Sequence, residues 1–158
     1  MGWRDLEAIL DDAGTRARFA ASVGAARASG HEVVVIHGGG AQVSRLTDAL
    51  GLVPRRVRGL RVTDDGTARA VLQVLGGEVN AVLVAALQGA GVPAVGLTGA
   101  DGGLFKAGVV DPVLGHVGAV EAHAAVTVER PGAGDRSAGA DDGDFLDRVR
   151  VGEGAGTQ

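Results

Sequence analysis

The chain has 158 residues, a formal net charge of −4 and no cysteine, and hydrophobic residues make up 46% of it while aromatic residues make up only 3%. This length suits one domain with its own core, and a core with few aromatic rings favours alternating helices and parallel strands over a β-sandwich. The missing cysteines exclude disulfides and thiolate metal sites, and an acidic balance with scattered arginines excludes the broad basic face of a nucleic-acid-binding protein.

The first part of the chain is predicted to form a helix, a strand and a second helix. Over residues 14–29, apolar side chains recur at spacings of four and three between arginines, which is typical of an amphipathic helix. Residues 33–36 form a run of Val and Ile, as in a strand buried on both faces of a parallel sheet. Helical spacing returns over residues 41–50 and ends at Gly51. Strand, glycine turn and helix make a βα unit whose turn faces the ligand crevice of an open sheet.

Two further helices are predicted in the middle of the chain. After an irregular stretch over residues 55–63, either Asp64 or Asp65 can cap a helix that covers about residues 67–75. A second helix is predicted over residues 78–88. The helical and extended segments together predict a protein of the α/β class.

Towards the C-terminal end the alternation of strand and helix fades. Residues 92–97 form a short apolar run, predicted as a strand, and residues 98–103 form a glycine-containing turn. From residue 131 the composition shifts to Gly, Asp, Ala and Arg, which predicts a disordered tail over residues 131–158 with one short helix near residues 144–150. We therefore expect one ordered domain over residues 1–130, followed by this tail.

Two sequence features are suited to binding an anion. Gly38, Gly39 and Gly40 follow the first predicted strand and open a helix, so backbone N–H groups and the helix dipole can approach a phosphate or carboxylate. A plain tight turn is an equal alternative in a chain with 28 glycines. The second feature is Arg61, whose guanidinium could hold a carboxylate through two hydrogen bonds. On spacing alone, a solvated surface arginine is the alternative.

Three other polar residues are interpreted as structural. His37, at the end of the first predicted strand, is expected to hydrogen-bond the turn, and Asn80 is expected to be a helix residue. Asp101 lies in a glycine-rich turn, where aspartates commonly bond the local backbone. With no cysteine and only 4 histidines, which are scattered, no metal site is predicted.

Five segments resemble the motifs of acetylglutamate kinases, and together they cover about residues 9–120. In order they are Val-Val-Ile-His-Gly-Gly-Gly-Ala-Gln, Gly-Leu-Arg-Val-Thr-Asp, Leu-Gly-Gly-Glu-Val-Asn, Ala-Val-Gly-Leu-Thr-Gly-Ala-Asp-Gly and Leu-Gly-His-Val-Gly. The resemblance implies a partial amino acid kinase fold, a three-layer αβα sandwich with a mostly parallel open sheet. It also implies ATP-dependent phosphorylation of the side-chain carboxylate of N-acetyl-L-glutamate in arginine biosynthesis, with ATP and Mg²⁺. The neighbouring aminoadipate kinases are a weaker match.

The resemblance also implies roles for particular residues. Gly39 and Gly40 would meet the substrate and the transferring phosphoryl group through backbone N–H groups, and Arg61 would hold the α-carboxylate. The implied partner is a small molecule, N-acetyl-L-glutamate or a similar acylated amino acid. Dimers are common in this family, and open sheet edges favour association, so a homo-oligomer is expected. No apolar run approaches the roughly 20 residues of a membrane span and no signal peptide is recognised, so a cytoplasmic protein without a membrane partner is expected.

The chain departs from the family at both catalytic lysines. Where the family has Lys-x-Gly-Gly, Arg4 falls at the lysine and Leu6 and Glu7 at the glycines, and a carboxylate there would repel the ATP phosphates. The family also continues well beyond Gly118, through a segment with a second lysine, whereas the single lysine of this chain, Lys106, lies outside both motifs. No catalytic residue is therefore assigned, and ATP binding by this chain alone is not expected.

Three hypotheses about function remain open at this point. The chain could be a kinase by descent that works with an ATP-binding lobe supplied elsewhere. It could instead be a non-catalytic module that binds an acylated amino acid or regulates another kinase chain by pairing with it. A generic nucleotide-binding α/β domain is the third, although the chain has neither a Gly-x-Gly-x-x-Gly motif nor a Walker lysine.

Overall fold

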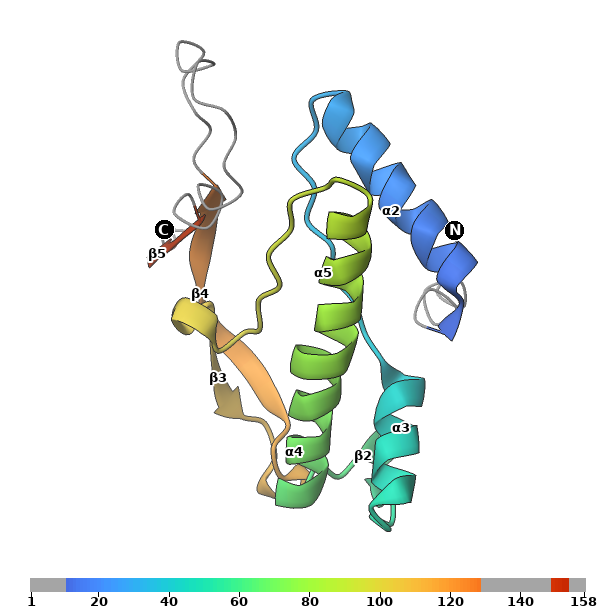
Figure 1. Ribbon diagram of the computed structural model, residues 1–158. Helices are drawn as coiled ribbons and strands as arrows, with labels where there is room; N and C mark the ends of the chain where they lie inside the picture. Colours follow the sequence, from blue (N-terminus) through green and yellow to red (C-terminus); the bar gives the residue numbers. More distant parts are fainter. Residues whose placement is uncertain (1–10, 129–148, 154–158) are drawn as a thin grey trace. The chain divides into compact units, whose positions relative to one another are not determined.

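The computed structural model describes residues 11–128 and 149–153. The chain divides into two units (Figure 1). We call Met1–Gly96 with Asp111–Val117 the helical unit, and Leu97–Val110 with Gly118–Gln158 the strand unit. Each unit is described by itself below.

The helical unit begins with helix α2, Ala13–Ala28, which confirms the first predicted helix. Its N-cap is Asp12, whose carboxylate accepts a hydrogen bond from the backbone N–H of Thr15. At the other end Ser29 is the C-cap, and Gly30 follows with a φ of 93°. A positive φ is a conformation that glycine adopts without steric cost, so Gly30 ends the helix as predicted.

Helix α3, Gly40–Ala49, confirms the second predicted helix, and a small hairpin follows it. The hairpin pairs β1, Arg56–Val57, with β2, Leu60–Arg61, in antiparallel register. Arg58 and Gly59 connect the strands with φ values of 50° and 82°. Two positive φ values are typical of the type I′ turns that join two-residue hairpins, so the stretch predicted to be irregular is a short hairpin.

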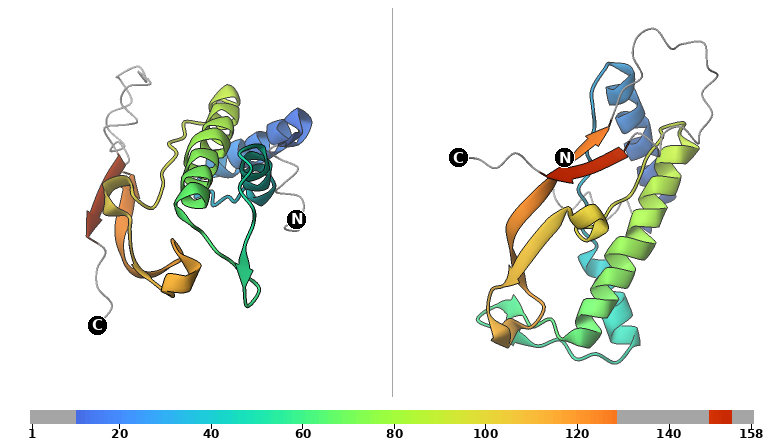
Figure 2. Two further views of the ribbon diagram at one scale, coloured as in Figure 1. Left: turned by 90° about the horizontal axis from the view of Figure 1, so that it is seen from below. Right: turned by 90° about the vertical axis from the view of Figure 1, so that its left-hand side faces the viewer.

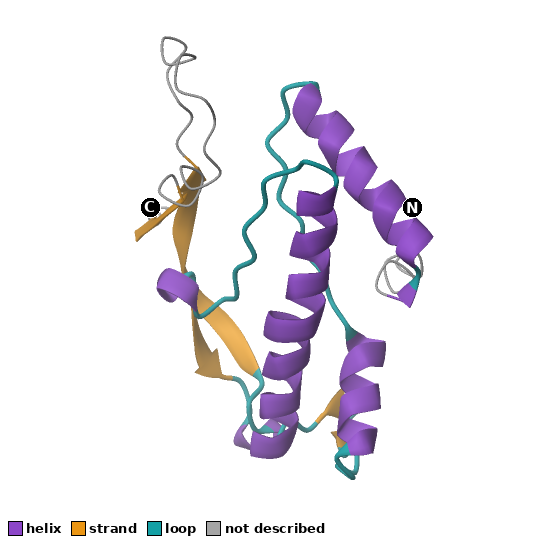
Figure 3. Ribbon diagram, viewed as in Figure 1, coloured by secondary structure: helices purple, strands orange, loops and turns teal. Residues whose placement is uncertain are grey.

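The next two predicted helices form one continuous helix (Figure 3). It consists of α4, Asp65–Leu72, a π-helical stretch η1, Gln73–Val79, and α5, Asn80–Gly89. Asp64 is the N-cap, because its carboxylate accepts a 2.8 Å hydrogen bond from the N–H of Thr67. The gap predicted between the two helices is wrong, since the wider π-helical turn absorbs the paired glycines 76 and 77 without a break.

Two clusters of buried side chains form the core of the helical unit. Figures 1 and 2 show α2 and α3 on the same side of the long helix, with α2 beside α5 and α3 beside α4 and η1. Phe19 packs against both clusters and so joins them. The first cluster contains Val43, Val74, Val79 and Leu83, and the second contains Ala20, Val23, Leu87 and Val92.

The long helix also has the dimensions of a membrane span, which the sequence did not lead us to expect. Asp65–Gly89 has 25 residues, and its most apolar stretch has a mean hydropathy of 1.8 with 28% of that stretch buried. Length and composition alone support this comparison, and core helices of soluble proteins pass the same test. In this structure the helix contributes Val74, Val79, Leu83 and Leu87 to the two core clusters.

The two predicted strands are loop segments in the structure. Residues 33–36 and 92–97 form no strand pairing with any described residue, so these two predictions are wrong. Val35 and Ala94 pack against the second core cluster, whereas the side chains of Val34 and Ile36 are 87% and 88% exposed. A β-branched run favours extended backbone, but a strand also needs a neighbour to hydrogen-bond. The α/β class is confirmed, although both sheets in the described part are antiparallel rather than parallel.

The strand unit is a three-stranded antiparallel sheet in the order β3-β4-β5. After a 3₁₀ turn at Asp101–Gly103, β3, Phe105–Val109, pairs with β4, Gly118–Val128. The third strand, β5, is Val149–Glu153, which pairs with the far end of β4. The short helix predicted near residues 144–150 is therefore wrong at its C-terminal end, and residues 144–148 lie outside the described residues. The division of the chain at residue 130 stays a prediction.

One segment late in the chain belongs to the helical unit. After the 3₁₀ turn Pro112–Leu114, Gly115 forms a parallel bridge with Thr63. The N–H of Thr63 donates to the carbonyl of Leu114 at 2.8 Å, and the N–H of His116 donates to the carbonyl of Thr63 at 2.7 Å. His116 Nε2 lies 2.7 Å from Asp65 Oδ1, beside the start of α4. These contacts fix the backbone that runs from β2 into the long helix.

The N-cap at Asp64 predicts how stability responds to acid. Hydrogen bonds from the backbone N–H and the hydroxyl of Thr67 lower the pKa of the Asp64 carboxyl below its ordinary value of 3.8. The carboxylate's contribution to stability is therefore complete above that value and is lost as the pH falls through the lower pKa of the folded state. Asparagine also caps helices but does not titrate, so we expect Asp64→Asn to flatten the acid-induced fall in Tm.

The measurement is Tm by circular dichroism from about pH 6 to about pH 2. Asp48→Asn is the matched control, because Asp48 is exposed and its side chain makes no hydrogen bond within residues 11–128. The control variant should show the same change of Tm with pH as the parent protein. An identical slope for Asp64→Asn would show that the cap does not contribute.

Candidate functional site

The glycine turn lies at the N-terminal end of α3, as the sequence predicts. The N-cap is Gly39, which has no side chain to bond the first N–H groups of the helix. An α-helix leaves these groups without partners of its own, and the helix dipole makes this end favourable for an anion. Next to the turn, His37 Nδ1 lies 3.2 Å from the carbonyl oxygen of Gly38, which confirms the local role predicted for this histidine.

Gly39 and Gly40 have different surroundings. Gly39 is buried, and a Cβ added there would lie 2.8 Å from Leu75 Cδ2 and 3.1 Å from Val79 Cγ2. Its glycine is therefore required by close packing on the long helix. Gly40 is exposed, and an added Cβ would meet nothing within 4 Å. Of the two, Gly40 has the more open space beside its backbone.

Alanine substitutions at these two glycines are expected to differ in their effect on stability. A methyl group at Gly39 must displace Leu75 and Val79, and overpacking of this kind costs about 1–3 kcal/mol. Gly40→Ala adds a methyl group to open space, so its effect should stay within about 0.5 kcal/mol or be mildly stabilising. Urea unfolding of both variants measures the difference. Equal losses would contradict the close packing of Gly39 on the long helix.

Arg61 is half-buried and its guanidinium is incompletely satisfied. It belongs to β2, and its Nη2 donates a 3.3 Å hydrogen bond to Oγ1 of Thr47, a residue of α3 with 0% exposure. Its Nε is buried and has no hydrogen-bond partner in the described part of the chain. A buried donor without a partner is costly. A cationic group held in this state is suited to receive a carboxylate from a ligand.

The three predicted site residues are connected through α3 rather than in direct contact. Gly39 and Gly40 mark the N-terminal end of the helix, whereas Arg61 reaches it at Thr47, in its C-terminal half. By the rise of an α-helix, Gly40 and Thr47 are about 10 Å apart along the axis. The helix thus has a positive end at the glycine turn and a positive side chain near its other end.

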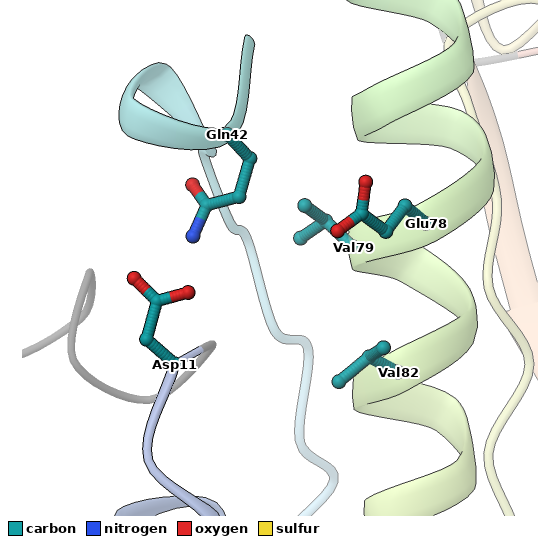
Figure 4. Close-up of a pocket in the computed structure, with 5 residues that line it drawn as sticks. All are labelled: Asp11, Gln42, Glu78, Val79 and Val82. Atoms are coloured by element: carbon teal, nitrogen blue, oxygen red, sulfur yellow. The ribbon is translucent and has the colours of Figure 1, made fainter. Parts of the chain in front are cut away.

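A small, open hollow lies beside the glycine turn, and Figure 4 shows the residues that line it. They are Asp11, Gln42, Glu78, Val79 and Val82. Gln42 is only 4% exposed, and neither side-chain amide atom has a hydrogen-bond partner among the residues described. The hollow has only about 20 Å³ of room for water-sized molecules, far below the usual range of ligand pockets, about 300–1,000 Å³, so it does not by itself accommodate an amino-acid substrate.

An ion pair closes one side of this hollow. Arg45 Nη2 lies 2.8 Å from Asp11 Oδ1, and both side chains are more than half exposed. The Arg45 guanidinium lowers the pKa of the Asp11 carboxyl through its hydrogen bond and its charge, and the Gln42 amide faces this carboxyl in Figure 4. Sequence reasoning missed Gln42 and Thr47, because apolar spacing identifies the buried face of α3 but not a polar residue placed on it.

The two other polar residues have the structural roles that were predicted. Asp101 Oδ2 accepts hydrogen bonds from the N–H and hydroxyl of Thr98 at 2.6 and 2.8 Å, and these bonds lower the pKa of its carboxyl. Asn80 is the first residue of α5, and its Nδ2 donates to the carbonyl of Gly76 at 3.4 Å. Within residues 11–128 and 149–153, no group of three or more His, Asp or Glu side chains is placed to hold a metal ion.

Comparisons with known proteins agree on one family. The sequence profile of the amino acid kinase family matches residues 7–131. An acetylglutamate kinase from Solibacter usitatus is 50% identical over 112 residues, which cover 71% of this chain and 44% of the relative. One from Geobacillus stearothermophilus is 43% identical over 104 residues, covering 65% of this chain and 40% of the relative. The chain therefore spans less than half the length of the curated relatives it matches.

One solved structure is also similar to this chain. It is an N-acetylglutamate synthase from Neisseria gonorrhoeae complexed with coenzyme A and N-acetyl-glutamate. The TM-score is 0.56 at 32% sequence identity, and the match covers 73% of this chain and 27% of that protein. Since the matched part is a minority of the larger protein, the likeness concerns the fold of this region.

Proposed function

Because the chain belongs to the amino acid kinase family, we propose that it carries the part of an acetylglutamate kinase that binds the acylated amino acid. The ligand is N-acetyl-L-glutamate, and the residues that bind it are Gly39, Gly40 and Arg61. The observation that carries this proposal is the buried Nε of Arg61, which has no hydrogen-bond partner among the described residues. The acetylglutamate kinases that match the chain support the choice of ligand.

The chemistry of the ligand suits the two positive groups along α3. N-acetyl-L-glutamate has a carboxylate at each end, so one can pair with the Arg61 guanidinium while the other meets the N–H groups at the glycine turn. The guanidinium is planar and offers parallel donors, which fit a carboxylate better than a lysine ammonium would. In this proposal Thr47 orients Arg61 through their hydrogen bond, and Gly40 leaves the helix end open to the second carboxylate.

ATP and Mg²⁺, which the family implies, do not fit the described residues. The helical unit contains no lysine, because Lys106 is the single lysine of the chain and belongs to β3. The acidic side chains Asp11 and Glu78 line the hollow with Val79 and Val82 and would repel phosphate groups. Phosphoryl transfer depends on positioned positive charge. We therefore derive no transfer step from these residues.

A second candidate function is a non-catalytic module that pairs with another kinase chain. The observation that favours it is the pair of acidic side chains, Asp11 and Glu78, that line the hollow beside the glycine turn. In either case we propose a cytoplasmic protein that forms homo-oligomers and takes part in arginine biosynthesis. Aminoadipate-type ligands are the competing substrate class.

Isothermal titration calorimetry of the full chain tests the proposal. We expect N-acetyl-L-glutamate to bind with a Kd in the range of about 1 μM to 1 mM, which is usual for substrates, and MgATP to release no heat of binding. N-acetyl-L-glutamine is the matched control ligand, because it keeps the α-carboxylate and replaces the side-chain carboxylate with an amide. Tight binding of MgATP without binding of N-acetyl-L-glutamate would overturn the proposal, and tighter binding of an N-acetylated aminoadipate would change the substrate class.

A further inference from the structure

The hollow beside the glycine turn is lined by one buried amide and two carboxylates. Gln42, in the first turn of α3, is 4% exposed, and neither its Oε1 nor its Nε2 has a hydrogen-bond partner among the described residues. Figure 4 shows this amide facing the carboxylate of Asp11, with the carboxylate of Glu78 directed toward it from the long helix. A buried amide without a partner is costly, and a ligand that bonds it removes that cost.

The room in the hollow limits the ligand to one small particle. About 20 Å³ is open to water-sized molecules, and one such particle needs about 10–15 Å³ of this kind of volume. An amino acid or a nucleotide is too large. Mg²⁺ is also excluded, because it gives up its bound water reluctantly and the hydrated ion does not fit. A water molecule fits, and so does a monovalent metal cation that has lost most of its water.

The charges around the hollow favour a cation over a water molecule. Arg45 matches the Asp11 carboxylate, because its Nη1 and Nη2 donate to the two carboxylate oxygens at 3.2 and 2.8 Å. Glu78 has no salt bridge within the described residues, so one negative charge is left over beside the hollow. Carboxylate and amide oxygens are the ligands that alkali and other hard cations prefer. Asp11 keeps free lone pairs for such an ion after it bonds Arg45.

We propose that Asp11, Gln42 and Glu78 form a binding site for a monovalent metal cation of the class of Na⁺ and K⁺. Its ligands are the amide oxygen of Gln42 and the two carboxylates. The ion joins the start of α2, the first turn of α3 and η1, and so holds the glycine turn against the long helix. This inference goes beyond the proposed function, because it rests on the hollow and not on the binding of N-acetyl-L-glutamate.

Thermal unfolding of the full chain in different chloride salts is the first part of the test. An ion that binds only the folded state raises its Tm. At about 0.2 M salt, the Tm should be at least about 3 °C higher in NaCl or KCl than in choline chloride, whose cation is too large for the hollow. Choline chloride at the same ionic strength screens surface charges equally. Equal Tm values in the three salts would overturn the proposal, and a larger increase in MgCl₂ at that ionic strength would overturn the monovalent ion.

Variants separate this site from a general effect of salt. Glu78→Gln removes the left-over charge with little change of shape, and Glu78 is exposed, so the core stays intact. The Tm difference between NaCl and choline chloride should disappear in this variant. Asp48→Asn is the matched control, because it removes a negative charge from the other end of α3, and it should keep the full difference. The proposal fails if the difference persists in Glu78→Gln or is lost in both variants.

Sodium NMR measures the binding directly. The sodium line should broaden in the presence of the parent protein and narrow again when KCl is added as a competitor. Gln42→Leu removes the amide at similar volume, so it should abolish the broadening and the dependence of Tm on the cation, whatever its Tm in choline chloride. Equal broadening by the parent, Gln42→Leu and Glu78→Gln would contradict the site. Calorimetry with N-acetyl-L-glutamate is run separately, and its failure would remove the proposed ligand without affecting this result.

Discussion

Replacing Arg61 with alanine is expected to weaken the binding of N-acetyl-L-glutamate by about 10- to 150-fold. This range corresponds to the roughly 1.5–3 kcal/mol that a hydrogen bond to a charged group contributes. The physical reason is the partly satisfied guanidinium, which bonds Thr47 through Nη2 but leaves Nε buried without a partner in the described residues. Calorimetry with the parent protein and the variant measures the change directly.

Arg56→Ala is the matched control, because Arg56 lies directly opposite Arg61 in the hairpin register and is exposed. Its loss should change the Kd by no more than about twofold, as expected for a solvated side chain. Arg61→Lys keeps the charge but loses the planar pair of donors, so its Kd should fall between those of the parent and the alanine variant. Equal effects at Arg56 and Arg61 would instead indicate a diffuse attraction of the anion to the hairpin.

Leu83→Ala is expected to lower the free energy of unfolding by about 2–5 kcal/mol, as leucine-to-alanine changes in protein cores do. Leu83 is 6% exposed and belongs to the first core cluster with Val43, Val74 and Val79. A loss of this size is a large fraction of the 5–15 kcal/mol that stabilises a typical domain. Urea unfolding followed by circular dichroism gives the value.

Leu72→Ala provides the comparison on the same long helix. Leu72 is 62% exposed, so its truncation should cost less than about 1 kcal/mol. If the two variants were equally destabilised, the face of the helix that carries Leu72 would have to be covered in solution.

The helices could be predicted from the sequence because their signals are local. The carboxylates of Asp12 and Asp64 each accept a hydrogen bond from a backbone N–H in the first turn of their helix. Gly30 ends its helix through a positive φ. The strands could not be predicted equally well, because pairing depends on residues far away in the chain. Residues 33–36 have strong strand propensity and no partner within the described residues, while Phe105–Val109 is largely exposed and pairs with β4.

The candidate site shows the same limit. Gly39, Gly40 and Arg61 were identified through ordered motifs, and their role in binding stays a prediction. Gln42 and Thr47 were missed, although both are buried on α3 and Thr47 is the residue that Arg61 contacts. A polar residue on the inner face of a helix differs from an apolar one only through its tertiary neighbours, which no local pattern contains.

The π-helical stretch η1 sets the rotational phase of the long helix. In an α-helix each residue turns by 100°, so one additional residue would rotate everything after it away from the core. The buried positions Val74 and Val79 are one wide turn apart, and Leu83 and Leu87 then follow at ordinary α-helical spacing. The wider π-helical turn therefore accommodates one more residue than an α-helical turn would, and the inner face of α5 stays aligned with that of α4. A homologous helix with one residue fewer here could present the same face to the core as an uninterrupted α-helix, so alignments of this region should tolerate a single-residue gap.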